Sequence, residues 1–175
     1  WRKKGIGGRG RQEFGFVRQR FPTHEAYADA TIDDLLNENQ RNQATVQRAH
    51  TFRSVVAVNQ GDGAFEMRPL PKQAQFAPSF GLLAEDVTGN GATDLLLTGN
   101  FHGMPSKLGR MASSYGSLLR GNADSSFTAV PSRKSGLLLR DQVRDVAVLN
   151  TARHGRVFVF AKNDAPLQIV APTDR

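Results

Sequence analysis

The sequence predicts a mainly β protein with a short helical segment ahead of the strands. From position 52 to the end, short β-branched and apolar runs alternate with turns rich in Gly, Asn and Asp, which is typical of antiparallel strands. Only the preceding stretch, residues 21–50, has apolar residues at helical spacing. With 175 residues, of which 39% are hydrophobic, the chain has enough apolar side chains for a core.

The composition excludes several classes of protein. The chain contains no cysteine, which removes disulfides, thiolate zinc sites and thiol catalysis. It has no apolar run of the roughly 18 residues that a membrane-spanning helix needs. The chain begins with Trp1 rather than Met, so we expect a fragment of a longer or processed polypeptide.

Residues 1–20 form a basic, glycine-rich segment that we predict to be irregular. Seven basic residues against Glu13 give this segment 7 − 1 = +6 of the chain's net charge of +7, so the remaining 155 residues carry only 7 − 6 = +1. An arm that binds nucleic-acid phosphates, running from Arg2 to Arg20, is therefore an alternative function. The near-neutral charge of residues 21–175 argues against this alternative, because it offers no further basic surface to phosphates. The segment also contains Gly5-x-Gly7-x-x-Gly10, which we interpret as a chance match to a dinucleotide-binding turn, because neither a strand nor a helix flanks it.

Residues 21–50 are predicted to be a helical insertion packed beside the main fold. Pro22 and Thr23 suit the start of a first helix. Thr31, with Asp34 three residues on, indicates the N-cap of a second helix.

The rest of this segment is predicted to be less regular. The run at 37–43 is a polar break, and a further helical turn is expected over 44–50. Two apolar faces are expected to be buried: Ala26, Tyr27 and Ala30, and then Ile32, Leu35 and Leu36.

Residues 51–171 are predicted to contain only strands and turns. Hairpin signals lie at Gln60-Gly-Asp-Gly, Gly121-Asn-Ala-Asp and Lys162-Asn-Asp. The expected strands are 54–59, 65–68, 79–84, 92–98, 115–120, 126–130, 137–140, 145–149, 156–160 and 167–170.

These strands recur as a repeat. Two segments share one order of features: a small residue and glycine, an apolar strand, an acidic turn, Asp, and a second apolar strand. They are SFGLLAEDVTGNGATDLLLTGN and KSGLLLRDQVRDVAVLN, and an outer hairpin follows each. SVVAVNQGDGAFEMRPLP, near residue 60, is a third outer hairpin without its first half. The equivalent Asp94 and Asp145 are 51 residues apart, in the range for four-stranded propeller blades. We therefore predict a partial β-propeller of about two to three blades of antiparallel strands.

The repeats resemble the FG-GAP/VCBS repeats of bacterial extracellular β-propellers, including those of the ASPIC/UnbV group. The resemblance covers residues 52–170 and is carried by DVTGNGATD (86–94) followed by LLL, by the turns NQGDGAF (59–65) and GNADSSF (121–127), and by LPKQAQFAP (70–78). It implies secretion or display at the cell surface, structural calcium, and recognition of a protein or carbohydrate ligand without catalysis. It also implies that the remaining blades belong to the same polypeptide.

The loop at 86–94 is the candidate metal site. Asp86, Thr88 and Asn90 stand at alternate positions, Gly91 supplies the turn, Ala92 could offer a carbonyl, and Asp94 adds a second carboxylate. The family's second and third aspartates are replaced by Thr88 and Asn90, which lowers the charge available to Ca²⁺. Two interpretations stay open: a weak structural calcium site, or a self-supporting turn in which Asp86 accepts backbone N–H groups. The equivalent loop from Asp141 to Asp145 is four residues shorter, and we expect no metal there.

No catalytic constellation is evident. The four histidines are scattered, with no pair at helical spacing, and no nucleophile is paired with a base. We therefore predict that the chain is not an enzyme. The long connection at 101–114 is expected either to pack over a neighbouring blade or to bind a partner.

Overall fold

The computed structural model describes residues 15–173. The chain divides into two compact units, Trp1–Phe52 and Arg53–Arg175, each of which is described by itself. Among the described residues, no helix is long and apolar enough to cross a membrane.

Within residues 15–52, the first unit contains four short helices: α2 (Gly15–Arg20), α3 (His24–Asp29), α4 (Ile32–Leu35) and α5 (Glu38–Gln43). Thr23 caps α3 by accepting from the N–H of Ala26 at 3.1 Å. The predicted N-cap at Thr31 is confirmed, since its backbone N–H donates to the carboxylate of Asp34 at 2.6 Å in a capping box. Local capping therefore starts α3 and α4.

Three details of this unit differ from the prediction. The stretch at 15–20, expected to be irregular, is helical as α2, with Val17 buried. The polar run at 38–43 is helix α5, because Asn37 and Gln40 form a capping box that needs no apolar face. The stretch at 44–50 is not helical. Residues 1–14, including the glycine spacing, lie outside the described residues.

The expected apolar faces are only partly buried. Tyr27 and Ala30 are buried as predicted, and Tyr27 packs edge-on against Phe21 with ring centroids 5.9 Å apart. Ala26 and Ile32 are exposed, and Leu35 is only half-buried. Helix α4 is a single turn, too short to present the buried stripe that its spacing suggested.

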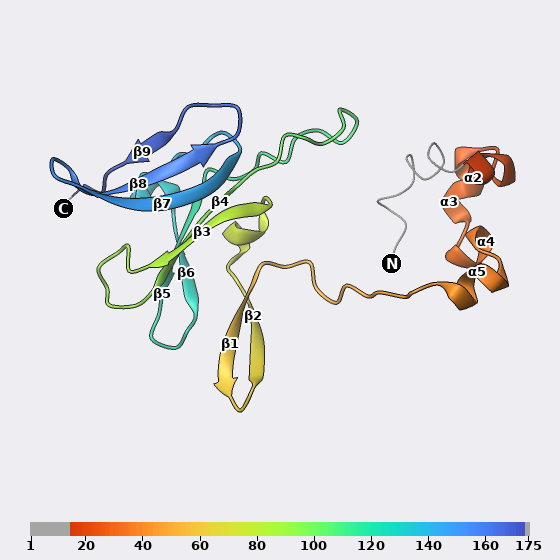
Figure 1. The fold of residues 1–175 in the computed structure, drawn as a ribbon, viewed down its shortest axis with the longest axis horizontal. Helices are drawn as coiled ribbons and strands as arrows, with labels where there is room; N and C mark the ends of the chain where they lie inside the picture. The colour runs from red at the N-terminus through yellow and green to blue at the C-terminus, as the bar shows by residue number, and fades with distance from the viewer. Residues whose placement is uncertain (1–14, 174–175) are drawn as a thin grey trace. The chain divides into compact units, whose positions relative to one another are not determined.

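The second unit is built from three antiparallel sheets, which confirms the mainly β prediction (Figure 1). The first sheet is the hairpin β1–β2, the second has the order β3-β4-β5-β6, and the third has the order β7-β8-β9. A 3-10 turn, η2 (Lys72–Gln75), connects the first sheet to the second. A short helix, α6 (Ser132–Ser135), follows the second sheet, so the prediction of only strands and turns over residues 51–171 is wrong there. No closed ring of sheets is present among the described residues. The strands are β1 (Val55–Gly61), β2 (Ala64–Pro69), β3 (Ser79–Glu85), β4 (Asp94–Gly99), β5 (Ser117–Gly121), β6 (Phe127–Val130), β7 (Val143–Thr151), β8 (Gly155–Lys162) and β9 (Gln168–Val170).

The strand predicted at 137–140 is wrong. This segment pairs with no neighbouring strand; instead, the N–H of Leu139 donates to the carbonyl of Tyr115 at 2.9 Å. Leu137 and Leu139 are nevertheless buried in the core. Their apolar character, which suggested a strand, serves packing rather than sheet pairing.

The four-stranded sheet is covered on both faces. Leu96 on β4 packs in one cluster with Val146 and Phe160 of the third sheet. Leu97 on the same strand packs in a second cluster with Leu70 and with Val56 of the first sheet. Because successive residues of a strand point to opposite faces, one strand contributes to both clusters.

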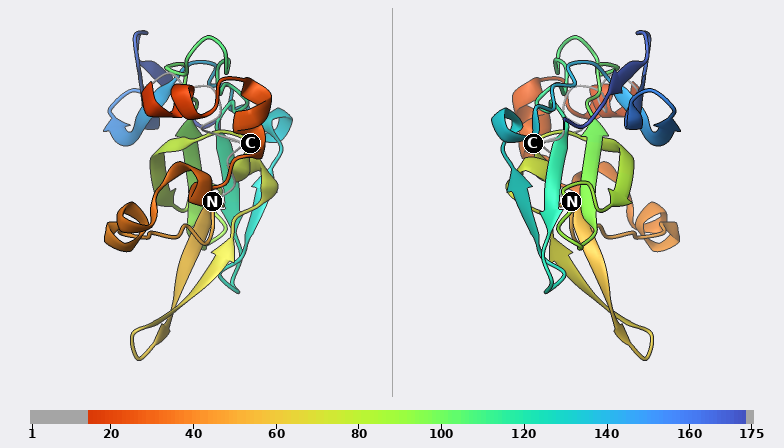
Figure 2. Two further views of the ribbon diagram at one scale, coloured as in Figure 1. Left: turned by 90° about the vertical axis from the view of Figure 1, so that its right-hand side faces the viewer. Right: turned by 90° about the vertical axis from the view of Figure 1, so that its left-hand side faces the viewer.

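The tip of the β5–β6 hairpin also contacts the base of the β1–β2 hairpin. Nη1 of Arg68, on β2, donates to the carbonyl of Asp124 in the turn between β5 and β6 at 3.0 Å. In both views of Figure 2 the two hairpins, yellow and cyan, project toward the same end of this unit.

Candidate functional site

The loop between β3 and β4 is folded around two carboxylates, beginning with Asp86. Its Oδ1 accepts from the N–H groups of Gly89 at 2.7 Å and Asn90 at 3.1 Å, and its Oδ2 accepts from Gly91 at 2.9 Å. Gly89 and Gly91 adopt positive φ, which lets the backbone curl around the carboxylate. Hydrogen bonds to the charged form lower the pKa of Asp86 below its ordinary value, with Gly91 contributing most.

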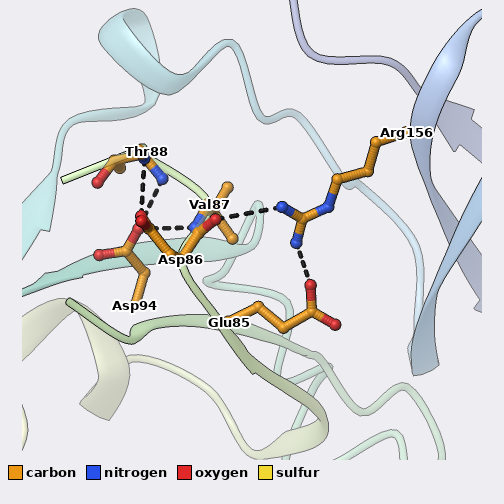
Figure 3. Close-up of polar contacts among 7 residues, drawn as sticks. Glu85, Asp86, Val87, Thr88, Asp94 and Arg156 are labelled. Atoms are coloured by element: carbon orange, nitrogen blue, oxygen red, sulfur yellow. Dashed lines mark hydrogen bonds and ion pairs between the residues drawn. The ribbon is translucent and has the colours of Figure 1, made fainter. Parts of the chain in front are cut away.

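Asp94 closes the loop from inside. Its side chain is 0% exposed, at the first residue of β4. One oxygen accepts from the N–H groups of Val87 at 3.0 Å and Thr88 at 2.7 Å, as Figure 3 shows. The other accepts from the N–H of Gly121, on β5, at 2.8 Å. Asp94 therefore joins the loop to two strands of its own sheet.

The remaining predicted ligands serve the same turn. Asn90 accepts from the N–H of Ala92 at 2.9 Å through Oδ1 and donates through Nδ2 to the carbonyl of Gly121 at 3.0 Å. Thr88 is exposed and takes part through its backbone N–H. The structure thus brings all five predicted residues into one loop, with most of their contacts directed at backbone groups.

Arg156, on β8, binds this loop from the third sheet. Its Nη1 donates to the carbonyl of Asp86 at 3.2 Å, and its Nη2 forms an ion pair with Glu85 (Figure 3). Its charge also contributes to the lowered pKa of Asp86. Arg156 was not singled out from the sequence, because it lies 70 positions beyond Asp86 and no local pattern connects them.

The residues of the loop do not fit a calcium ion in this arrangement. Calcium takes about six to eight oxygen ligands, and each carboxylate offers about four lone-pair directions. Asp86 and Asp94 each use three of theirs on backbone N–H groups, and the amide oxygen of Asn90 is also occupied. The neighbouring Arg156 adds a fixed positive charge. Of the two interpretations left open by the sequence, the geometry favours the self-supporting turn over the weak calcium site.

The equivalent stretch of the third sheet contains no comparable loop. Asp141 forms an ion pair with Lys162 at 2.9 Å, and Asp145 already lies within β7. Across residues 15–173, no group of three or more His, Cys, Asp or Glu side chains is placed to hold a metal ion.

Comparisons with protein-family models, with curated proteins and with solved structures find no match for this chain. The function proposed below therefore rests on the geometry and on the resemblance of the repeats.

Proposed function

We propose that residues 53–173 are part of a non-catalytic β-propeller module that acts in recognition outside the cytoplasm. The observation that carries this proposal is the stacking of successive sheets in one register. Leu95 and Leu97 on β4 pack toward the first sheet, whereas Leu96 packs toward the third.

The next sheet repeats this register. Aligning Asp145 with Asp94 places Val146 and Val148 at the positions of Leu95 and Leu97, and both pack back toward the four-stranded sheet. Ala147, the equivalent of Leu96, is then the residue that would face a following sheet. In a propeller each blade packs between two others, so alternate residues of a strand face the preceding and the following sheet.

The outermost faces support further blades. On the third sheet, Leu149 is 53% exposed and Ile169 is 64% exposed. On the first sheet, Phe65 and Met67 are similarly exposed. Exposed apolar sheet faces of this kind mark interaction surfaces. We propose that further blades of the same polypeptide cover them.

The role outside the cytoplasm comes from the resemblance to FG-GAP/VCBS repeats. We propose a protein or carbohydrate ligand, no catalytic step, and a loop around Asp86 that is structural. The near-neutral charge outside residues 1–20 supports this proposal over a nucleic-acid-binding protein, which is the alternative.

Co-sedimentation of the full chain with intact bacterial cells and with insoluble polysaccharides tests the recognition role. We expect part of the protein to sediment with one of these materials and to leave its polysaccharide chains unshortened. Absence of sedimentation with every material, or release of soluble sugar, would contradict the proposal.

The alternative is tested in parallel with duplex DNA and single-stranded RNA. A nucleic-acid-binding arm would give an affinity that falls steeply with salt and disappears when residues 1–20 are deleted. We expect no binding at physiological salt. Salt-dependent binding that is lost with the arm would replace the recognition role.

A further inference from the structure

Two β-bulges aim side chains toward each other across neighbouring sheets. The pairing of β3 with β4 skips Phe80, between Ser79 and Gly81, and the pairing of β7 with β8 skips Arg144. A bulge turns a side chain away from its regular direction and is frequent beside functional sites. The guanidinium of Arg144 consequently lies 4.3 Å from the centre of the Phe80 ring.

A second aromatic ring completes this arrangement. Phe101 follows β4. Its ring centre lies 5.7 Å from the guanidinium of Arg144 and 6.3 Å from the centre of the Phe80 ring. Residue Phe80 is 45% exposed. We call Phe80, Phe101 and Arg144 the aromatic–arginine platform.

Buried amides hold the platform in place. Oε1 of Gln142 accepts from Nη2 of Arg144 at 3.0 Å and from the N–H of His102 at 2.9 Å. Asn100 is 1% exposed and has a φ of 76°. Its Nδ2 donates to the carbonyl of Ser114, and its Oδ1 accepts from the N–H of Ser114. These two hydrogen bonds hold together the two ends of the long connection beside Phe101. The platform is therefore preorganised.

Arg144 has no acidic partner. Within residues 15–173, none of the ion pairs involves Arg144, and its guanidinium donates a hydrogen bond only to Gln142, which leaves four of its five N–H donors for a ligand. The connection at 101–114 contributes Lys107 and Arg110 and contains no acidic residue. Nε2 of His102 is also buried without a hydrogen-bond partner in this part of the chain.

We propose that the aromatic–arginine platform binds a carboxylate-bearing carbohydrate, such as a uronate residue of an acidic polysaccharide. Arg144 presents a planar fork that pairs with a carboxylate through two hydrogen bonds. The exposed Phe80 ring offers an apolar surface for the sugar ring beside it, and Lys107 and Arg110 meet further carboxylates along the polymer. This inference rests on the proposed function and names its ligand class.

The test measures binding of the full chain to polygalacturonate and to its fully methyl-esterified form, which has the same backbone without the charge. At low ionic strength we expect esterification to weaken binding at least about tenfold, and Arg144→Gln to weaken binding of the acidic polymer by a similar factor. Arg144→Lys should recover part of the affinity, because an ammonium group keeps the charge but not the fork.

Arg153→Gln is the matched control. It removes the same charge from the turn at the far end of β7, roughly 25 Å along the strand. We expect its affinity to stay within about twofold of the wild type. Phe80→Leu, which keeps an apolar residue at an exposed position, should weaken binding while leaving the melting temperature unchanged.

Several outcomes would overturn the inference. Equal losses from Arg144→Gln and Arg153→Gln would indicate nonspecific attraction between charges. Equal binding of the esterified polymer would remove the carboxylate site but leave the recognition role standing. Equally tight, Arg144-dependent binding of polyglutamate would show that the ligand is an acidic peptide, and absence of binding to polygalacturonate would remove the site.

Discussion

Asp94 is the residue on which the loop between β3 and β4 depends most. It is fully buried and accepts three backbone N–H groups, from Val87, Thr88 and Gly121. Asp94→Ala would leave those donors without a partner, at a cost of about 1–3 kcal/mol for each group that water cannot reach.

We therefore expect Asp94→Ala to lower the free energy of unfolding by about 3 kcal/mol or more in urea titration. Asp94→Asn keeps one acceptor oxygen and should cost less. Exposed Asp62, in the turn between β1 and β2, provides the control. Asp62→Asn should be close to neutral, because asparagine tolerates the left-handed backbone at this position, where φ is 46°. An Asp94→Ala variant as stable as Asp62→Asn would contradict the role given to Asp94.

Calcium is the second test at this scale. Because the carboxylates of Asp86 and Asp94 are occupied by backbone N–H groups, we expect the melting temperature of the wild type to be insensitive to calcium. Thr88→Asp combined with Asn90→Asp restores the missing charge at the correct spacing. At calcium roughly tenfold above its dissociation constant, this variant should gain about 1.4 kcal/mol, or on the order of 3–5 °C.

Magnesium, which demands a smaller octahedral site, is the control ion. A calcium-dependent rise in the wild type would show that the loop still binds the ion. No response from the doubly substituted variant would mean that the loop lacks the backbone shape of a calcium site.

The sequence predicted which residues form this loop but not what holds it. The spacing from Asp86 to Asp94 is local, so it could be recognised directly. Arg156 and Gly121 lie 70 and 27 positions from their loop partners, and only the packing of strands brings them together. Arg144 could not be singled out from the sequence, because its contact with Phe80 depends on two bulges that no local pattern predicts.

At the scale of elements, β3 and β7 approach closely at Gly81. A Cβ at this position would lie 2.4 Å from Oγ1 of Thr98 and 2.9 Å from Cα of Asp145. At this position strand β3 therefore contacts the backbone of the third sheet directly.

Gly81→Ala should push these strands apart and lower the free energy of unfolding of the β unit by about 1–3 kcal/mol. Gly15→Ala, where a Cβ meets nothing within 4 Å, is the control and should leave this transition unchanged. The measurement is urea unfolding followed by circular dichroism. An unchanged midpoint for Gly81→Ala would contradict the close approach.

The sequence predicted the positions of the strands more accurately than those of the helices. Short apolar and β-branched runs between Gly- and Asp-rich turns predicted nine strands near their observed places, because both signals are local. The segment at 137–140 is also an apolar run but lacks a partner strand. Helix α5 was missed because its stability comes from capping by Asn37 rather than from an apolar face.

At the scale of the whole β unit, the two outer sheets are each covered on one face only. The first sheet has two strands, so it covers only part of the four-stranded sheet. Leu82, on β3, pairs with Leu97 and remains exposed on the face that packs toward the first sheet. Leu149 and Ile169 are exposed at the opposite end of the stack. A stack of this kind is open at both ends.

Open apolar faces and unpaired strand edges favour association between copies when their proper neighbours are absent. We expect Met67→Lys together with Ile169→Lys, one charge on each outer face, to suppress such association without loss of strand content by circular dichroism. A matched pair at exposed turn positions, Asp62→Lys and Asp164→Lys, should not suppress it.

Sedimentation velocity of the 175-residue chain over a range of concentrations tests the stacked, open arrangement most directly. The arrangement predicts a sedimentation coefficient that rises with concentration in the wild type and stays constant in the Met67→Lys, Ile169→Lys variant. A wild-type chain that remains monomeric at every concentration and melts in one cooperative transition would show that the fold is complete by itself, and would contradict the propeller proposal.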